Sequence, residues 1–253
     1  MKIEVWSDFM CPFCYLGKRR LEIALNKFEH RNEVELVFRS FELDFAAKKK
    51  FDGNIHEIIA KKYGISVEQA KASNNQIVEQ AKAIGLEYDF DNLIPTNTFD
   101  AHRITHYAKT EGKMNELAER ILKAYFIDSL NISDYKVLAG LAGEVGLNID
   151  KALQVLESDK YGAEVRNDEE SASKLKISGV PYFVFNNKYA ISGAQQPELF
   201  LEMLEKVRKE ELSLPIEKFT VEEQSQDDSS LGICSDGKCK IWDCIGMINF
   251  LKN

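Results

Sequence analysis

Apolar and polar residues follow two different periods near the start of the chain. Residues 1–6, MKIEVW, alternate between the two kinds, as a half-buried β-strand does. Residues 34–39, VELVFR, are rich in β-branched and aromatic side chains and predict a second strand. Between these segments the apolar positions recur every three or four residues and predict an amphipathic helix: Leu16, Leu21, Ala24, Leu25 and Phe28. The order strand, helix, strand indicates a βαβ unit.

The pattern from about residue 50 to residue 175 is typical of helices alone. Glycines stand where helices would stop, and short polar residues stand where they would start. The expected stops are Gly64, Gly85, Gly112 and Gly146, and the expected N-caps are Ser66, Thr98 and Ser133. Strand patterns return at residues 181–185 and 189–192, where three intervening polar residues predict a hairpin. A last helix is expected from Gln196-Pro197 to about Arg208.

These elements predict an α/β fold that is interrupted by an all-helical domain. We expect residues 1–48 and 161–212 to form two parts of one α/β domain, with residues 49–160 inserted between them as the helical domain. Residues 213–253 would then be a linker and a cysteine-containing C-terminal tail. The acidic, serine-rich composition of residues 222–230 is typical of such a linker.

Charge and hydropathy exclude two classes of partner. The 253 residues include 33 Lys and Arg against 41 Asp and Glu, and the cationic side chains form no stripe, so we expect no nucleic-acid binding. No run approaches the roughly 20 apolar residues that cross a bilayer, and the first residues predict a strand rather than a signal peptide. We therefore expect no membrane association and a cytoplasmic location.

The five cysteines are too few for a disulfide scaffold in a chain of this length, and their grouping indicates chemistry. Cys11 and Cys14 form a C-x-x-C motif, and the other three are Cys234, Cys239 and Cys244. Because Pro12 suits the first position of a helix, Cys11 would lie at the helix N-terminus, where the helix dipole stabilises a thiolate. Cys14 would follow one turn later and could resolve a mixed disulfide.

Two other interpretations of the first pair remain open. C-x-x-C is also half of a zinc site, which Cys234 and Cys239 could complete, and two buried thiols could be inert. A proline between the cysteines at a strand-to-helix junction favours the redox interpretation. We therefore expect no metal site and no resident cofactor.

Several longer segments resemble the DsbA-like thioredoxin-fold family, and in particular its FrnE-type cytoplasmic proteins. They are WSDFMCPFCYLG at residues 6–17, YGISVEQA at 63–70, NTFDAHR at 97–103, GVP at 179–181, AISGAQ at 190–195 and the C-terminal cysteine pair. The resemblance implies a thioredoxin fold with an inserted helical domain and a substrate groove between the two.

The resemblance also implies roles for individual residues. Cys11 would be the nucleophile of a disulfide oxidoreductase or isomerase, and Cys14 would be the resolving thiol. Pro181 would be a cis proline opposite them, whereas the sequence pattern alone would favour a trans proline that opens the strand. Substrates, expected to be proteins or peptides with thiols or disulfides, would touch Pro12 and Phe13 beside the nucleophile and the backbone of Val180 and Pro181.

The same superfamily includes hydroxychromene-carboxylate isomerases and kappa-class glutathione transferases, which typically carry serine where Cys11 stands. A serine hydroxyl cannot form a disulfide, so the cysteine pair favours electron transfer. A glutathione-dependent transferase or isomerase of small aromatic substrates is the first alternative, and glutathione as a reductant or co-substrate is also open. A non-catalytic adaptor or zinc-binding protein is the second.

The remaining candidate residues lie in the helical segment and the tail. His102 and His106 share one helix face but lack the glutamate that a zinc hydrolase motif requires, and His102 with Arg103 matches a family segment that could face the groove. Cys234 and Cys239 are expected to be an accessory redox pair, a role that the FrnE-type resemblance supports. Cys244 belongs to an apolar terminal segment that would dock on the body of the protein or on a second subunit of a homodimer.

Overall fold

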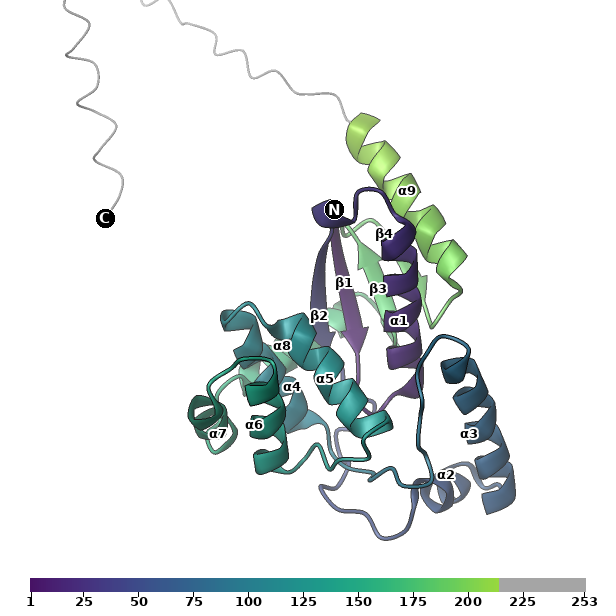
Figure 1. Cartoon of the computed structure of the whole chain (residues 1–253), viewed down its shortest axis with the longest axis vertical. Coiled ribbons are helices and arrows are strands. Elements are labelled where there is room, and N and C mark those ends of the chain that lie inside the picture. The colour runs from purple at the N-terminus through teal and green to yellow at the C-terminus, as the bar shows by residue number, and fades with distance from the viewer. Residues whose placement is uncertain (214–253) are drawn as a thin grey trace, which may run out of the picture. The chain divides into compact units, whose positions relative to one another are not determined.

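A four-stranded mixed sheet forms the centre of the fold (Figure 1). The computed structural model describes residues 1–213. The strands are β1 (Lys2–Ser7), β2 (Glu35–Ser40), β3 (Tyr182–Phe185) and β4 (Tyr189–Ser192), in the order β2-β1-β3-β4. β1 and β2 are parallel, and β3 is antiparallel to both β1 and β4. The predicted βαβ unit and the predicted hairpin are therefore both confirmed.

Two helices cover one face of this sheet. They are α1 (Pro12–Lys27) and α9 (Pro197–Ser213), which pack against each other (Figure 1). The apolar core beneath them combines Ile3, Val5, Leu21, Phe183, Phe185 and Phe200. α9 extends five residues beyond the expected end at Arg208. On the opposite side, Trp6 and Val184 pack with Ala172 of α8 (Gly162–Lys174).

The segment between β2 and β3 is helical, as predicted. A short 3₁₀ turn at Arg31–Glu33 precedes β2. The segment after β2 comprises seven helices: α2 (Ile55–Tyr63), α3 (Val67–Lys82), α4 (Phe99–Thr110), α5 (Met114–Phe126), α6 (Tyr135–Glu144), α7 (Ile149–Leu156) and α8. One large apolar cluster joins the helices α4, α5, α6 and α7 to Phe9, which lies before α1, and to Leu16 of α1. The limits of the inserted helical domain, residues 49 and 160, stay predictions. α4 and α8, which lie on either side of residue 160 in the sequence, pack together.

The helix ends follow the predicted signals with two exceptions. Gly64 adopts the left-handed conformation that ends α2, and Ser66 starts α3 with a reciprocal capping box. Thr98 stands at the N-cap of α4, but its side chain makes no capping hydrogen bond. Ser133 is not an N-cap: the Asp134 carboxylate accepts the first N–H groups of α6. The Ser133 hydroxyl instead donates to Asn131 and, across 84 positions of the chain, to the Lys49 carbonyl. Within the described residues, no helix is long and apolar enough to cross a membrane.

Candidate active site

Cys11 occupies the N-cap of α1, directly before Pro12. Its backbone is extended, its N–H donates to the Asp8 carbonyl at 3.2 Å, and its carbonyl accepts the Cys14 N–H at 3.0 Å. The first turn of α1 carries no acidic side chain, so nothing there neutralises the positive end of the helix dipole. The Cys11 sulfur therefore lies at the positive end of the α1 dipole.

Cys14 lies one turn further and is 1% exposed. Burial raises the pKa of the Cys14 thiol well above its ordinary value, and the adjacent Cys11 raises it further. The Asp8 N–H donates to the Cys14 sulfur at 3.4 Å. The two thiols therefore differ in their surroundings: Cys11 lies at the helix N-terminus, and Cys14 is buried behind it with a raised pKa.

The loop before β3 lies against Cys11. The Val180–Pro181 peptide bond is cis, and the Val180 carbonyl lies 3.6 Å from the Cys11 sulfur. The backbone of Val180 is therefore next to the Cys11 sulfur, where a bound substrate would lie.

Gly17 allows α1 to approach this loop closely. A Cβ atom on Gly17 would lie 2.9 Å from Pro181 Cγ and 3.1 Å from the Phe183 ring. Overpacking costs about 1–3 kcal/mol, whereas exchanging glycine for alanine inside a helix gains up to about 1 kcal/mol. We expect Gly17→Ala to lower the free energy of unfolding by about 1–2 kcal/mol in urea titrations. Gly140→Ala in α6, where a Cβ meets nothing within 4 Å, is the matched control and should not destabilise the protein.

An apolar pocket of about 350 Å³ opens beside Cys11. Its lining includes Pro12 and Phe13, Ile58 and Ile59 of α2, and Tyr125 and Phe126 at the end of α5. Phe13 keeps 42% of its surface exposed although it stands between the two cysteines. The pocket reaches Cys11, which lines it although the residue is only 4% exposed, and its apolar lining suits an apolar side chain.

Tyr88 connects the helical segment to the C-x-x-C motif. Its hydroxyl donates to the Pro12 carbonyl at 2.8 Å, and its ring lies 4.8 Å from the Phe126 ring. Burial, followed by the nearby Tyr15 and cysteines, raises the pKa of the Tyr88 phenol far above its usual range, so the hydroxyl remains a donor. Nothing in the sequence around Tyr88 indicated this contact, because it joins residues 76 positions apart.

A buried acid and a buried histidine lie behind the motif. Asp8 accepts the Leu43 N–H at 2.7 Å and the Met10 N–H at 3.3 Å, and one of its oxygens lies 3.5 Å from Nε2 of His102. His102 is completely buried, and neither ring nitrogen has a hydrogen-bond partner within the described residues. His106 instead contacts Ser40 at 3.1 Å. The two histidines do not share a ligand, and no group of three metal-ligating side chains forms in residues 1–213.

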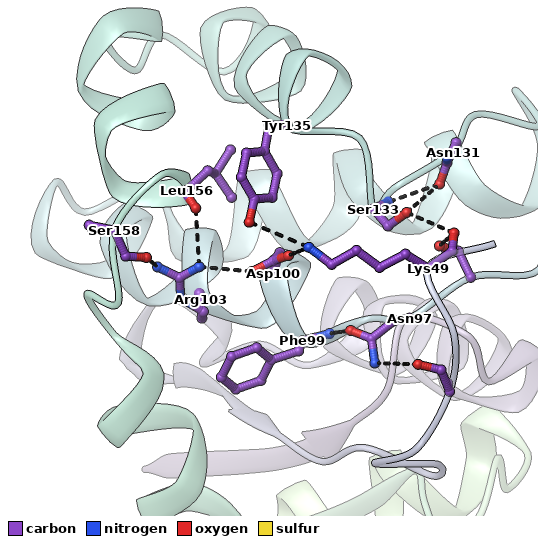
Figure 2. Close-up of polar contacts among 12 residues, drawn as sticks. Lys49, Asn97, Phe99, Asp100, Arg103, Asn131, Ser133, Tyr135, Leu156 and Ser158 are labelled. Atoms are coloured by element: carbon purple, nitrogen blue, oxygen red, sulfur yellow. Dashed lines mark hydrogen bonds and ion pairs between the residues drawn. The ribbon is translucent and has the colours of Figure 1, made fainter.

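Arg103 ties the connection between α7 and α8 to α4 (Figure 2). Its guanidinium donates to Asp100 at 2.8 Å and to backbone carbonyls of Val155, Leu156, Ser158 and Lys160. Lys49 donates to the other Asp100 oxygen at 2.7 Å. Neither His102 nor Arg103 lines the pocket beside Cys11. Cys234, Cys239 and Cys244 lie outside the described residues, so the accessory redox pair stays a prediction.

A βαβ unit, an antiparallel hairpin and a C-x-x-C motif at a helix N-terminus define a thioredoxin-fold protein with a dithiol site. A model of the DSBA-like thioredoxin domain matches residues 2–205, and the chain belongs to that family. The fold predicted from the sequence is thereby confirmed.

Similar proteins support this assignment to different extents. The uncharacterized protein YwbO of Bacillus subtilis strain 168 is 30% identical over 200 residues, covering 78% of this chain and 92% of the relative. The crystal structure of the probable DsbA oxidoreductase SCO1869 from Streptomyces coelicolor is 39% identical, with a TM-score of 0.80, and covers 85% of this chain and 93% of that one. A 2-hydroxychromene-2-carboxylate isomerase, 14% identical with a TM-score of 0.65, covers 85% of this chain and all of its own, and shares the fold.

Proposed function

We propose that the protein is a thiol-disulfide oxidoreductase that acts on disulfides of proteins or peptides. The observation that carries the proposal is the asymmetry of the two sulfurs. Both residues are largely buried, Cys11 at 4% and Cys14 at 1% exposure, but Cys11 stands at the helix N-terminus and lines the pocket, whereas Cys14 does not line it and burial raises the pKa of its thiol. Membership of the DSBA-like family supports the same chemistry. The cytoplasmic location stays a prediction of the sequence.

The exchange proceeds in two displacements. The Cys11 thiolate attacks one sulfur of the substrate disulfide, a Cys11–substrate disulfide forms, and the other substrate sulfur leaves as a thiolate that takes up a proton. Cys14 then loses its proton and attacks the Cys11 sulfur, which forms the Cys11–Cys14 disulfide and releases the second substrate thiolate. A dithiol or two molecules of glutathione would reduce the enzyme again, and a reduced substrate would run the same steps in reverse.

Replacing Cys14 tests the order of these steps. Cys14→Ala is expected to accumulate the Cys11–substrate disulfide, because the thiol that resolves it is gone. Incubation with a disulfide-bonded peptide, quenching with acid and intact-mass spectrometry should show a stoichiometric adduct. Both the Cys14→Ala variant and the Cys11→Ala, Cys14→Ala control would also carry alanine at Cys234, Cys239 and Cys244, so that Cys11 is the one thiol that differs between them, and the control should show no adduct. An adduct on the control, or none on the Cys14→Ala variant, would contradict the proposal.

The same variants separate the proposed function from its rivals. A glutathione-dependent isomerase of small aromatic substrates would keep its activity in Cys14→Ala, since its chemistry needs one sulfur or hydroxyl only. A zinc-binding adaptor would be purified with stoichiometric zinc and would release few titratable thiols.

A further inference from the structure

The apolar pocket beside Cys11 continues into a second hollow that carries positive charge. This lysine hollow has a volume of about 510 Å³ and is lined by Lys48, Phe51, Asp52, Ile58, Lys61 and Lys62. Ile58 and Lys62 line both spaces, so the two meet along one face of α2. The combined groove is apolar at Cys11 and cationic further away.

The charge of the lysine hollow is unusual for this protein. The chain carries a formal net charge of −8, yet three lysines line the hollow against the single carboxylate of Asp52. Lys48, Lys61 and Lys62 are exposed, and none of them forms an ion pair with another residue of the described part of the chain. Some lysines elsewhere are paired with carboxylates, as Lys71 is with Asp91, and others, such as Lys151, have no such partner within residues 1–213. The feature of the hollow is therefore that three lysines unpaired within these residues line one space.

We infer that the preferred substrate is a polypeptide segment with a large apolar residue beside the reactive cysteine and acidic residues further along. This inference rests on the proposed function and names its substrate class. The apolar side chain would fill the pocket lined by Phe13 and Ile59, and carboxylates would replace water around Lys61 and Lys62. A sphere of 350 Å³ is about 9 Å across, which an extended chain at about 3.3 Å per residue covers in about three residues.

Matched peptides test the inference. Three fluorogenic peptides would each contain one disulfide and a leucine beside the attacked cysteine, with two Asp, two Asn or two Lys residues about three positions away. For the wild-type protein we expect kcat/KM to be about fivefold to tenfold higher for the Asp peptide than for the Asn peptide, and lowest for the Lys peptide. The preference should shrink as salt is raised, because these charges are exposed.

Charge reversal identifies the residues responsible. In the K61E/K62E variant the Asp peptide should lose its advantage over the Asn peptide, and the Lys peptide should become the better substrate. The control is K151E/K209E, which changes the net charge equally at exposed lysines on α7 and α9 that line neither space. This control should keep the wild-type order.

Each outcome separates the two proposals. If the wild-type protein turns over all three peptides equally, or if the control loses the preference as K61E/K62E does, the inference is wrong while the proposed function stands. If K61E/K62E slows reduction of oxidised glutathione as much as it slows the Asp peptide, the lysines serve a small anion and the inference is again wrong. If the wild-type protein turns over no peptide at all, the proposed function itself fails.

Discussion

Cys11→Ser should reduce the rate of disulfide exchange by at least about a thousandfold, because an alcohol cannot form the mixed disulfide and its oxygen stays protonated at the helix N-terminus. Cys14 cannot take over, since it does not line the pocket and burial raises the pKa of its thiol. Reduction of a disulfide-bonded protein, followed by turbidity or by labelling of new thiols, measures the loss.

The serine variant is also expected to remain folded. Serine is close to cysteine in size, and the Cys11 side chain contacts the Val180 carbonyl at 3.6 Å and the Cys14 thiol, contacts that a hydroxyl can also make. Unfolding in urea should therefore shift by less than about 1 kcal/mol. Cys14→Ser, which places a hydroxyl among buried groups, is the comparison for stability. Exchange by Cys11→Ser at more than about a tenth of the wild-type rate would contradict the assignment of the nucleophile.

The parts of the fold that depend on local pattern could be predicted from the sequence. The strands at residues 2–7 and 182–185 have clear patterns, and Pro12 places the start of α1 correctly. Gly64 and Ser66 gave reliable helix ends because their signals act within one turn. The prediction of Ser133 as an N-cap was wrong because its hydroxyl donates to the Lys49 carbonyl, which lies 84 residues away and is not indicated by any local pattern.

The candidate site also has a part that the sequence predicts and a part that it does not. The C-x-x-C motif could be found because both cysteines lie within one turn of helix. The pocket beside it could not be found, since its lining combines Phe13 with α2 and with Tyr125 from the end of α5. Asp8 also escaped the sequence analysis: its contacts with Leu43 and His102 require three separate segments to meet. Long-range packing therefore decides which substrate the predicted chemistry can reach.

Arg103→Ala is expected to lower the free energy of unfolding by about 3–5 kcal/mol, the usual cost of removing one partner from a buried charge network. Arg103 is 3% exposed, and its removal would leave Asp100 with one cation, Lys49, and leave carbonyls at the end of α7 without their donor (Figure 2). Arg103→Lys should recover part of this loss, because an ammonium group cannot reproduce the fork of N–H donors. Urea unfolding followed by circular dichroism provides the measurement.

Arg120→Ala is the matched control, since Arg120 pairs with Asp128 and Glu144 at the surface and such pairs contribute about 1 kcal/mol or less. The Arg103 variants also separate a structural role from a role in the substrate groove. If Arg103 holds only the α7–α8 connection, the folded fraction of Arg103→Lys should be alkylated at Cys11 at the wild-type rate and should keep its order of peptide preference. A variant that is as stable as the wild type but exchanges disulfides slowly would instead place Arg103 at the substrate. Because the guanidinium is bonded to four backbone carbonyls and does not line the pocket, we expect the first result.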